Sequence, residues 1–182
     1  MPRTDSGSPE ASAVIRTVGH GTRTTDELAG LLREAGVRTV IDVRRYPTGR
    51  RQPHLSTQRL AVDLPERGLA YEWWGEALGG RRRRPPGSEG AGESDASSGW
   101  RNPAFAAYAE HMATPEFGTA LSAIEERARS GEAMALMCAE TLWWRCHRRL
   151  IADALVRDGL AVEHLIDRVP GRRHRLLTGA RS

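Results

Sequence analysis

The sequence predicts an α/β fold: a single three-layer domain built on a largely parallel, Rossmann-like sheet. The first observation is that short apolar runs, typical of buried strands, alternate with segments whose apolar residues recur at helical spacing. The second is that the connections between them are short, so the strand–helix–strand units should form right-handed parallel crossovers. The third is the length of 182 residues, which is enough for one hydrophobic core.

The N-terminal part of the chain holds the clearest strand–helix–strand unit. Residues 13–20 form an apolar run that ends in a Gly-His-Gly turn, and residues 37–43 are rich in β-branched side chains, as in a buried strand. Between them, Thr24 and Glu27 have the spacing of a capping box, so a helix should begin there and end at Gly36. These two strands should therefore lie parallel in one sheet.

The same alternation continues along the chain, with capping residues and prolines marking the helix starts. The remaining expected elements are a helix capped by Ser56, a strand over 69–74, helices beginning at Pro103 and Pro115, a strand over 132–138, a helix from Trp143 to Arg157 and a strand over 160–166. This order favours a sheet covered by helices on both faces.

Polar, low-complexity segments set the expected limits of the domain. Residues 1–12 are typical of a disordered tail, and residues 169–182 of a basic C-terminal tail. The domain should span residues 13–168. Within it, residues 79–99 are rich in Gly, Pro, Ser and charge without periodicity, which predicts a mobile loop insertion.

The basic residues are all of one kind. The net charge is +4, and all 27 positive residues are arginine, a bias for which GC-rich coding is the simpler cause. Without lysine, Schiff-base catalysis and a lysine-dependent phosphate loop are excluded, so anions must be bound by guanidinium groups or backbone amides. The charge permits nucleic-acid binding without establishing it.

The sequence favours a cytoplasmic location. The polar N-terminal residues lack the apolar core of a secretory signal, and no apolar run reaches the roughly 20 residues that a membrane span needs, so no membrane partner is expected. The two cysteines do not form a disulfide framework and should be free thiols.

Polar residues follow three of the expected strands. They are Gly19 and His20 after the first strand, Asp42 and Arg44 after the second, and Cys138 and Glu140 after the fourth. Because parallel sheets bind ligands at the carboxyl ends of their strands, these segments should form one site.

Each of these residues also has a structural interpretation. Cys138 should face a helix N-terminus that lowers its pKa toward the thiolate, or it is a small buried apolar residue. Glu140 is either a general acid/base or a partner of the helix N-terminus. His20 moves protons or belongs to a tight turn, and Asp42 with Arg44 forms either part of the site or an internal salt bridge.

Cys146, His147 and Arg148 fall on the expected helix from Trp143. Its apolar spacing places His147 on or beside the core face, so core packing is the structural alternative for both Cys146 and His147. Adjacent residues on a helix point about 100° apart, and seven residues separate Cys138 from Cys146, so no metal site is expected. A redox pair is a further alternative, although the spacing is not C-x-x-C.

The motifs "TVGHGT", "IDVRRYP", "YEWWGEALGG", "GWRNPAFAAYAEHM", "LMCAE" and "CHRRLIADAL" occur in this order. With these motifs in this order, the chain closely resembles the domain of unknown function 488 family over roughly residues 15–166. The resemblance implies that the polar residues above form an active site, and it brings no reaction with it. Gly21 and Gly49 depart from the family, which usually has serine at or near these positions.

We therefore expect an enzyme that acts on a small anionic or phosphate-bearing substrate, such as a nucleotide or nucleic acid. The residues expected to take part in catalysis are Cys138, Glu140, His20 and Asp42, and those expected to bind the substrate are Arg44, Arg148, Cys146, His147 and Gly19. No metal and no cofactor are expected. The alternatives are a nucleic-acid or nucleotide binding module without catalysis and, more weakly, a thiol redox or metal sensor.

Overall fold

The computed structural model describes residues 14–82 and 103–176. In this part of the chain, a six-stranded sheet has the order β3-β2-β4-β1-β5-β6, in which only β6 is antiparallel to its neighbour. The strands are β1 (Val14–Gly19), β2 (Thr39–Asp42), β3 (Ala70–Trp73), β4 (Met134–Cys138), β5 (Ala161–Leu165) and β6 (Arg172–Arg173). The predicted α/β fold with a largely parallel sheet is confirmed. The strand order differs from that of a dinucleotide-binding sheet, because β4 lies between β1 and β2.

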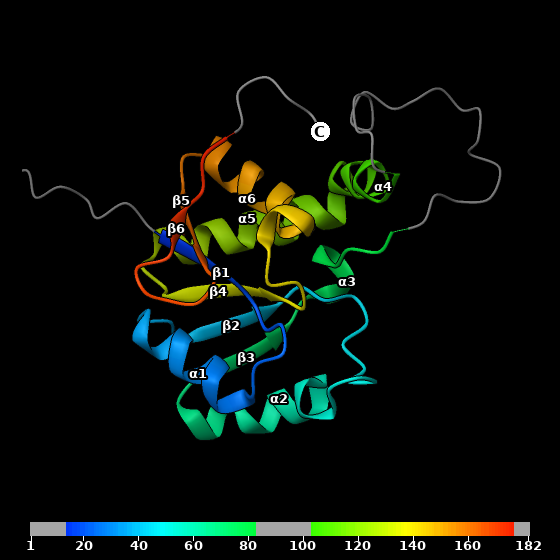
Figure 1. The fold of residues 1–182 in the computed structure, drawn as a ribbon. Helices are drawn as coiled ribbons and strands as arrows, with labels where there is room; N and C mark the ends of the chain where they lie inside the picture. The colour runs from blue at the N-terminus through cyan, green and yellow to red at the C-terminus, as the bar shows by residue number, and fades with distance from the viewer. Residues whose placement is uncertain (1–13, 83–102, 177–182) are drawn as a thin grey trace, which may run out of the picture.

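Helices cover both faces of the sheet (Figure 1). They are α1 (Thr25–Glu34), α2 (Thr57–Asp63), α3 (Gly75–Leu78), α4 (Pro103–Met112), α5 (Pro115–Arg129) and α6 (Arg148–Arg157), with 3-10 turns at Pro53–Leu55, Pro65–Arg67 and Trp143–Arg145. Helices α1 and α2 lie on one face, and α3 to α6 lie on the other. Neighbouring strand residues bury their side chains in two separate apolar clusters, Val40 on the α1 side and Ile41 on the α5 side. The domain therefore has three layers.

The start of α1 follows from its capping box. The Glu27 N–H donates to Thr24 Oγ1 (3.2 Å), and the Thr24 N–H donates to Glu27 Oε2 (2.8 Å). Two of the otherwise unpaired N–H groups of the first turn are thus satisfied. The helix ends before Gly36, whose φ of +73° suits glycine.

The helix expected from Trp143 begins later in the structure. Trp143–Arg145 form a 3-10 turn, Cys146 is extended, and α6 starts only at Arg148. The Trp143 ring stacks on His164 of β5 with a centroid distance of 4.0 Å, which holds this turn against the sheet. This contact overrides the helical spacing of the sequence.

The sheet also extends beyond residue 168, the expected end of the domain. Strand β6 pairs with β5, and His174 just after it is buried. His174 is the one buried side chain in a stretch of arginines, so the sequence pattern there does not indicate a strand. The expected tail over 1–12, residues 83–99 of the expected loop and residues 177–182 lie outside the described residues.

None of the helices in the described residues is long and apolar enough to cross a membrane.

A chain of hydrogen bonds, which we call the histidine chain, crosses from α6 through β1 and β5. Arg148 Nη1 donates to Thr17 Oγ1 (3.2 Å), and the Thr17 hydroxyl is hydrogen-bonded to His164 Nδ1 (2.7 Å). His164 Nε2 is hydrogen-bonded to His174 Nδ1 (2.9 Å), and His174 Nε2 donates to Asp153 Oδ1 (2.8 Å). A carboxylate can only accept, so His174 Nε2 carries the hydrogen of its bond with Asp153, and Arg148 can only donate to Thr17 Oγ1.

We expect the free energy of unfolding to decrease as the pH falls below 6.5. Burial, followed by the charges of His174, Arg148 and Arg172, lowers the pKa of His164 from 6.5 to about 3. The unfolded chain therefore binds a proton at His164 that the folded chain does not, and stability that is full above pH 6.5 is lost as the pH falls toward about 3. One such group gives a slope of up to about 1.4 kcal/mol per pH unit. Denaturant unfolding at a series of pH values measures it.

Two variants test whether His164 causes this pH dependence. His164→Asn should make the slope shallower, whereas His54→Gln, at an exposed histidine outside the histidine chain, should leave it unchanged. The same slope in His164→Asn as in the unsubstituted protein would contradict the assignment.

Candidate active site

The carboxyl ends of β2, β4 and β1 lie next to one another at one edge of the sheet. Gly19 of β1 pairs with Cys138 of β4, and the His20 N–H donates to the Cys138 carbonyl (2.9 Å). On the other side of β4, Asp42 of β2 pairs with Met137. The three polar segments expected from the sequence are therefore adjacent in space.

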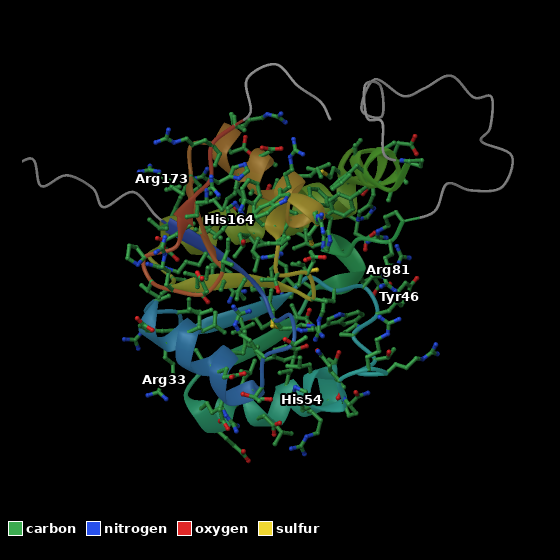
Figure 2. The ribbon with its side chains drawn as sticks, viewed as in Figure 1. Arg33, Tyr46, His54, Arg81, His164 and Arg173 are labelled. Atoms are coloured by element: carbon green, nitrogen blue, oxygen red, sulfur yellow. The ribbon has the colours of Figure 1, made fainter. Side chains whose placement is uncertain are left out.

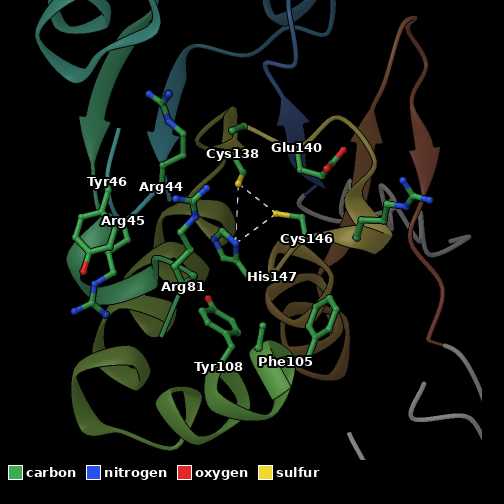
Figure 3. Close-up of a pocket in the computed structure, with 14 residues that line it drawn as sticks. Arg44, Arg45, Tyr46, Arg81, Phe105, Tyr108, Cys138, Glu140, Cys146 and His147 are labelled. Carbon is green, nitrogen blue, oxygen red and sulfur yellow. Dashed lines mark hydrogen bonds between the residues drawn. The ribbon is translucent and has the colours of Figure 1, made fainter. Parts of the chain in front are cut away.

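Cys138, Cys146 and His147 form a compact group at this edge, which we call the thiol–imidazole cluster (Figure 3). The two Sγ atoms are 3.2 Å apart. His147 Nδ1 lies 3.4 Å from Cys146 Sγ and 4.0 Å from Cys138 Sγ. Both cysteines are buried free thiols. Three groups that can bind a metal or act as nucleophiles and bases thus share one small volume.

The His147 ring is held in one orientation and one tautomer. Its Nε2–H donates to the Val43 carbonyl (3.1 Å), so in the neutral imidazole the lone pair is on Nδ1, beside the two sulfur atoms. Tyr108 packs edge-on against the ring with a centroid distance of 5.1 Å. Gly80 leaves the space that the ring needs, because a Cβ there would lie 2.7 Å from Nδ1. The imidazole lone pair is therefore directed by its surroundings.

The backbone before α6 brings the cluster together. Cys146 is extended (φ −125°, ψ 153°), and His147 is the N-cap residue of α6. The expectation that Cys146 and His147 lie one turn into a helix is therefore wrong, and with it the reason for which both binding one ion was expected to be awkward. Because the two residues precede the regular helix, both side chains reach the sulfur atom of Cys138.

Arg148 is a buried cation beside the cluster. Its side chain is 1% exposed and donates to Thr17 Oγ1 (3.2 Å) and to the Glu140 carbonyl. Its Nε has no hydrogen-bond partner, and no carboxylate among the described residues pairs with it. A buried charge without a counter-ion favours negative charge nearby, and Cys146 is in a position to carry it.

The two thiols differ in acidity. The hydrogen bond with Cys138 and, after it, the charge of Arg148 lower the pKa of Cys146 to about 6, although burial alone would raise it. The same bond, together with burial, raises the pKa of Cys138 to about 12. The expected lowering of the Cys138 pKa is therefore wrong. The physical reason is that the hydrogen bond with Cys146 and burial both favour the neutral thiol at Cys138.

Arg44 and Asp42 form a buried ion pair that shapes the loop after β2. Arg44 Nη2 donates to Asp42 Oδ2 (2.6 Å), and Arg44 Nε donates to Oδ1 (2.9 Å). The Tyr71 hydroxyl donates to the same Oδ2 (2.7 Å), and Arg44 Nη1 donates to the Leu55 carbonyl (2.9 Å). These bonds match the structural alternative for the pair, an internal salt bridge.

His20 is engaged at both ring nitrogens. Its Nε2 accepts from Arg44 Nη1 (3.0 Å), and its Nδ1–H donates to the Gly21 carbonyl (3.0 Å). Burial, followed by the charge of Arg44, lowers the pKa of His20 to about 4. The imidazole is therefore neutral at pH 7 and connects the turn after β1 to the Asp42–Arg44 ion pair.

A pocket of about 370 Å³ opens over the thiol–imidazole cluster. The buried sulfur atoms and His147 form its floor, and Tyr108 and Phe105 form an aromatic wall. Its outer part carries guanidinium groups from Arg45, Arg81 and Arg145. The pocket therefore combines reactive groups inside with positive charge at its mouth.

A second cavity, of about 690 Å³, lies next to the first. It is lined by His20 and by the loop over 46–52, and it shares Tyr46 and Arg81 with the first pocket. Figure 2 shows Tyr46 and Arg81 close together, on the other side of the molecule from Arg173. The expected site residues are thus divided, with His20 in one cavity and the thiol–imidazole cluster in the other.

Gly19 and Glu140 have mainly structural contacts. A Cβ at Gly19 would lie 1.9 Å from the Glu140 carbonyl oxygen, so glycine allows β1 and the turn after β4 to approach each other. Gly19 lines neither cavity. The Glu140 carboxylate accepts from the Leu142 N–H (3.0 Å) and points away from the sulfur atoms (Figure 3).

Several residues of the pocket were not identified from the sequence. They are Arg45, Tyr46, Gly80, Phe105, Tyr108 and Arg145, whereas Arg81 belongs to the arginine run 81–84 of the expected loop, which could contact phosphate. Tyr108, Phe105 and Gly80 lie in motifs that carried the family resemblance, which was the one signal available for them. No local pattern indicates that an exposed arginine lies over a distant cysteine.

The local backbone geometry explains why glycine stands at the two positions that depart from the family. Gly21 has a φ of +56°, and a Cβ there would lie 2.4 Å from Thr141 Oγ1. Gly49 has a φ of +68°, and a Cβ there would lie 2.7 Å from Ser56 Cβ. A serine at either position would be strained in this backbone.

Fold and site define an α/β protein with a thiol–imidazole cluster at the carboxyl edge of a mostly parallel sheet. The family model "Domain of unknown function DUF488" matches residues 24–155, and the chain belongs to this family. The match contains all three residues of the cluster. No curated protein and no solved structure matches the chain.

We expect Asp42→Asn to lower the free energy of unfolding by about 3 to 5 kcal/mol, because the buried Arg44 guanidinium then lacks its counter-charge. The pair of Asp26, 80% exposed, with Arg67 is the matched control. Asp26→Asn should cost less than about 1 kcal/mol. Denaturant unfolding at pH 7 compares the two, and similar small effects would show that the buried pair does not support the loop.

Proposed function

We propose that this protein is an enzyme that acts on a small anionic substrate bound in the pocket over the thiol–imidazole cluster. The observation that carries the proposal is the combination in one cavity of about 370 Å³ of a buried Cys/Cys/His group with arginine side chains at its mouth. Cavities of this size suit small molecules, and sites with convergent reactive groups are typical of enzymes.

Arg81 is the side chain best suited to hold the anion. Its guanidinium points toward the cluster, whereas that of Arg44 points away (Figure 3). Its backbone has a φ of +57°, in the left-handed region that residues other than glycine rarely adopt. Such strain is common at binding sites, where it directs a side chain. Gly80 before it packs on His147, so the same short segment supports both groups.

The anion-binding role expected of Arg44 and Arg148 is better filled by Arg81. Arg44 is paired with Asp42, and Arg148 donates to Thr17 and to a backbone carbonyl. Both therefore contribute positive charge, Arg44 from the lining of the pocket and Arg148 from outside it. Arg81 is exposed and forms no salt bridge within the described residues, so its donors are available to a ligand.

The aromatic wall limits the kind of substrate. Tyr108 is buried, with its hydroxyl donating to the Leu78 carbonyl (2.7 Å), so it presents its ring rather than its hydroxyl to the pocket. Phe105 adds a second apolar surface. A substrate with an anionic group for the arginines and a compact organic part for the aromatic wall fits this pocket better than a bare inorganic ion.

A binding module for nucleic acids, without catalysis, is the second candidate. It is favoured by Arg50 and Arg51, which are exposed and line the neighbouring cavity beside Arg81. Such a module would bind an oligonucleotide with an affinity that falls steeply with salt and is lost in an Arg50→Ala/Arg51→Ala variant. It would be unaffected by Cys146→Ser.

We expect Arg81→Ala to weaken binding of inorganic phosphate, used as the simplest anionic probe, by about 10-fold or more through loss of a charge-assisted hydrogen bond. Arg59→Ala, at an exposed arginine on α2 outside the pocket, is the matched control and should bind phosphate as the unsubstituted protein does. Calorimetric titration measures the affinity. Equal affinities in Arg81→Ala and Arg59→Ala would remove Arg81 from the site.

A further inference from the structure

We propose that Cys138, Cys146 and His147 bind one zinc ion, with a fourth coordination position that opens into the pocket. This inference rests on the proposed function for its role, since it names the reactive centre of that pocket. Among the described residues, these three offer one sulfur, one sulfur and one nitrogen within 4.8 Å of one another.

The separations fit a single ion. With bond lengths of about 2.3 Å to sulfur and 2.0–2.1 Å to nitrogen, a tetrahedral zinc site places its sulfur atoms about 3.8 Å apart and sulfur and nitrogen about 3.6 Å apart. The cluster has 3.2 Å between its sulfur atoms and 3.4 and 4.0 Å between sulfur and Nδ1. Shifts of about half an ångström would therefore complete the site.

The imidazole is already arranged as a metal ligand. Histidines that bind metals usually donate their other ring N–H to a carbonyl or carboxylate, which fixes the tautomer and the ring orientation. His147 donates its Nε2–H to the Val43 carbonyl (3.1 Å), and its free Nδ1 faces the sulfur atoms. Tyr108 and Gly80 restrict the ring further.

The ligand types select the metal. Two sulfur atoms and one imidazole suit zinc, whereas magnesium and calcium prefer oxygen ligands. Zinc also removes the protons of the thiols it binds, and its double positive charge balances the two thiolates in a buried site. The Arg148 and Arg44 side chains lie behind this group, and Asp42 neutralises only Arg44. The filled site would thus keep a positive charge, which favours an anion at the open position.

Three protein ligands with one open position are typical of catalytic rather than structural zinc. The open position faces the cavity that also contains Arg81 and the aromatic wall. A zinc ion there would act as a Lewis acid toward an oxygen of the substrate or toward a bound water. The substrate anion and the metal would then be brought together by the same pocket.

The histidine chain is not a competing metal site. The nitrogen atoms of His164 and His174 are engaged in hydrogen bonds with each other, with Thr17 and with Asp153. An ion could bind there only by breaking this chain.

Titration of reduced, chelator-treated protein with Co²⁺, followed by Zn²⁺, tests the proposal. We expect one equivalent of Co²⁺ per chain, with near-ultraviolet thiolate-to-cobalt charge-transfer absorption and the visible bands of tetrahedral cobalt, and displacement by Zn²⁺. Absence of charge-transfer absorption together with absence of bound zinc would overturn the proposal. The same result would be expected if the cysteines act only as a redox pair or as a nucleophile.

Single substitutions locate the metal. Cys138→Ser, Cys146→Ser and His147→Gln should each weaken Co²⁺ binding by at least about 100-fold, since even the loss of an outer hydrogen bond to a ligand costs 10–100-fold. His54→Gln, at an exposed histidine away from the pocket, is the matched control and should bind Co²⁺ normally. Retention of binding by all three variants would place the metal elsewhere.

A measurement on the unsubstituted protein covers the case in which these variants do not fold. Zinc should protect both thiols from alkylation, and a chelator should restore their reactivity. Equal alkylation with and without zinc would overturn the proposal. Phosphate binding by Arg81→Ala separates the two hypotheses: this variant should keep Co²⁺ binding and lose phosphate. If the unsubstituted protein binds the metal but no anion, the proposed function fails and the zinc site stands.

Discussion

The parallel register of β2, β4 and β1 is the constraint on which the candidate site depends. Because these strands are neighbours, their carboxyl ends deliver Asp42, Cys138 and Gly19 to one edge. The hydrogen bond from His147 to the Val43 carbonyl then ties the start of α6 to the end of β2. The thiol–imidazole cluster itself comes from one stretch, residues 138–147, and the Val43 carbonyl at the end of the neighbouring strand orients its imidazole.

The charges around this edge fall into two layers. In the inner layer, Arg44 is neutralised by Asp42 and fixes the loop and His20, while Arg148 has no carboxylate partner among the described residues and lowers the pKa of Cys146. In the outer layer, Arg81 is exposed at the mouth of the pocket. The inner layer stabilises negative charge on sulfur, and the outer layer attracts negative charge from solution. An anionic substrate would be drawn toward the same groups that favour thiolates.

Much of the fold follows from local signals in the sequence. Strand-like runs, the Thr24 capping box and the prolines at the helix starts predicted the parallel sheet and most helices, because each signal acts within a few residues. The start of α6 was missed because stacking of Trp143 on His164, a contact between distant residues, interrupts the helical pattern. Strand β6 was missed because it rests on one buried histidine among arginines.

The site could be predicted in part. The polar strand ends identified Cys138 and its neighbours, but the placement of Cys146 and His147 on a regular helix made a shared ion unexpected. The extended backbone of Cys146 removes that geometric objection. Arg44 is paired with Asp42 in the loop, whereas Arg81 points toward the pocket. This difference depends on the three-dimensional arrangement and cannot be read from the residue types.

X-ray absorption at the zinc edge, on protein purified under reducing conditions and loaded with one equivalent of zinc, tests the central claim most directly. A zinc ion held by Cys138, Cys146 and His147 should show two sulfur scatterers at about 2.3 Å and a histidine nitrogen at about 2.0–2.1 Å, with one further light atom. A shell of oxygen and nitrogen atoms without sulfur would contradict the account.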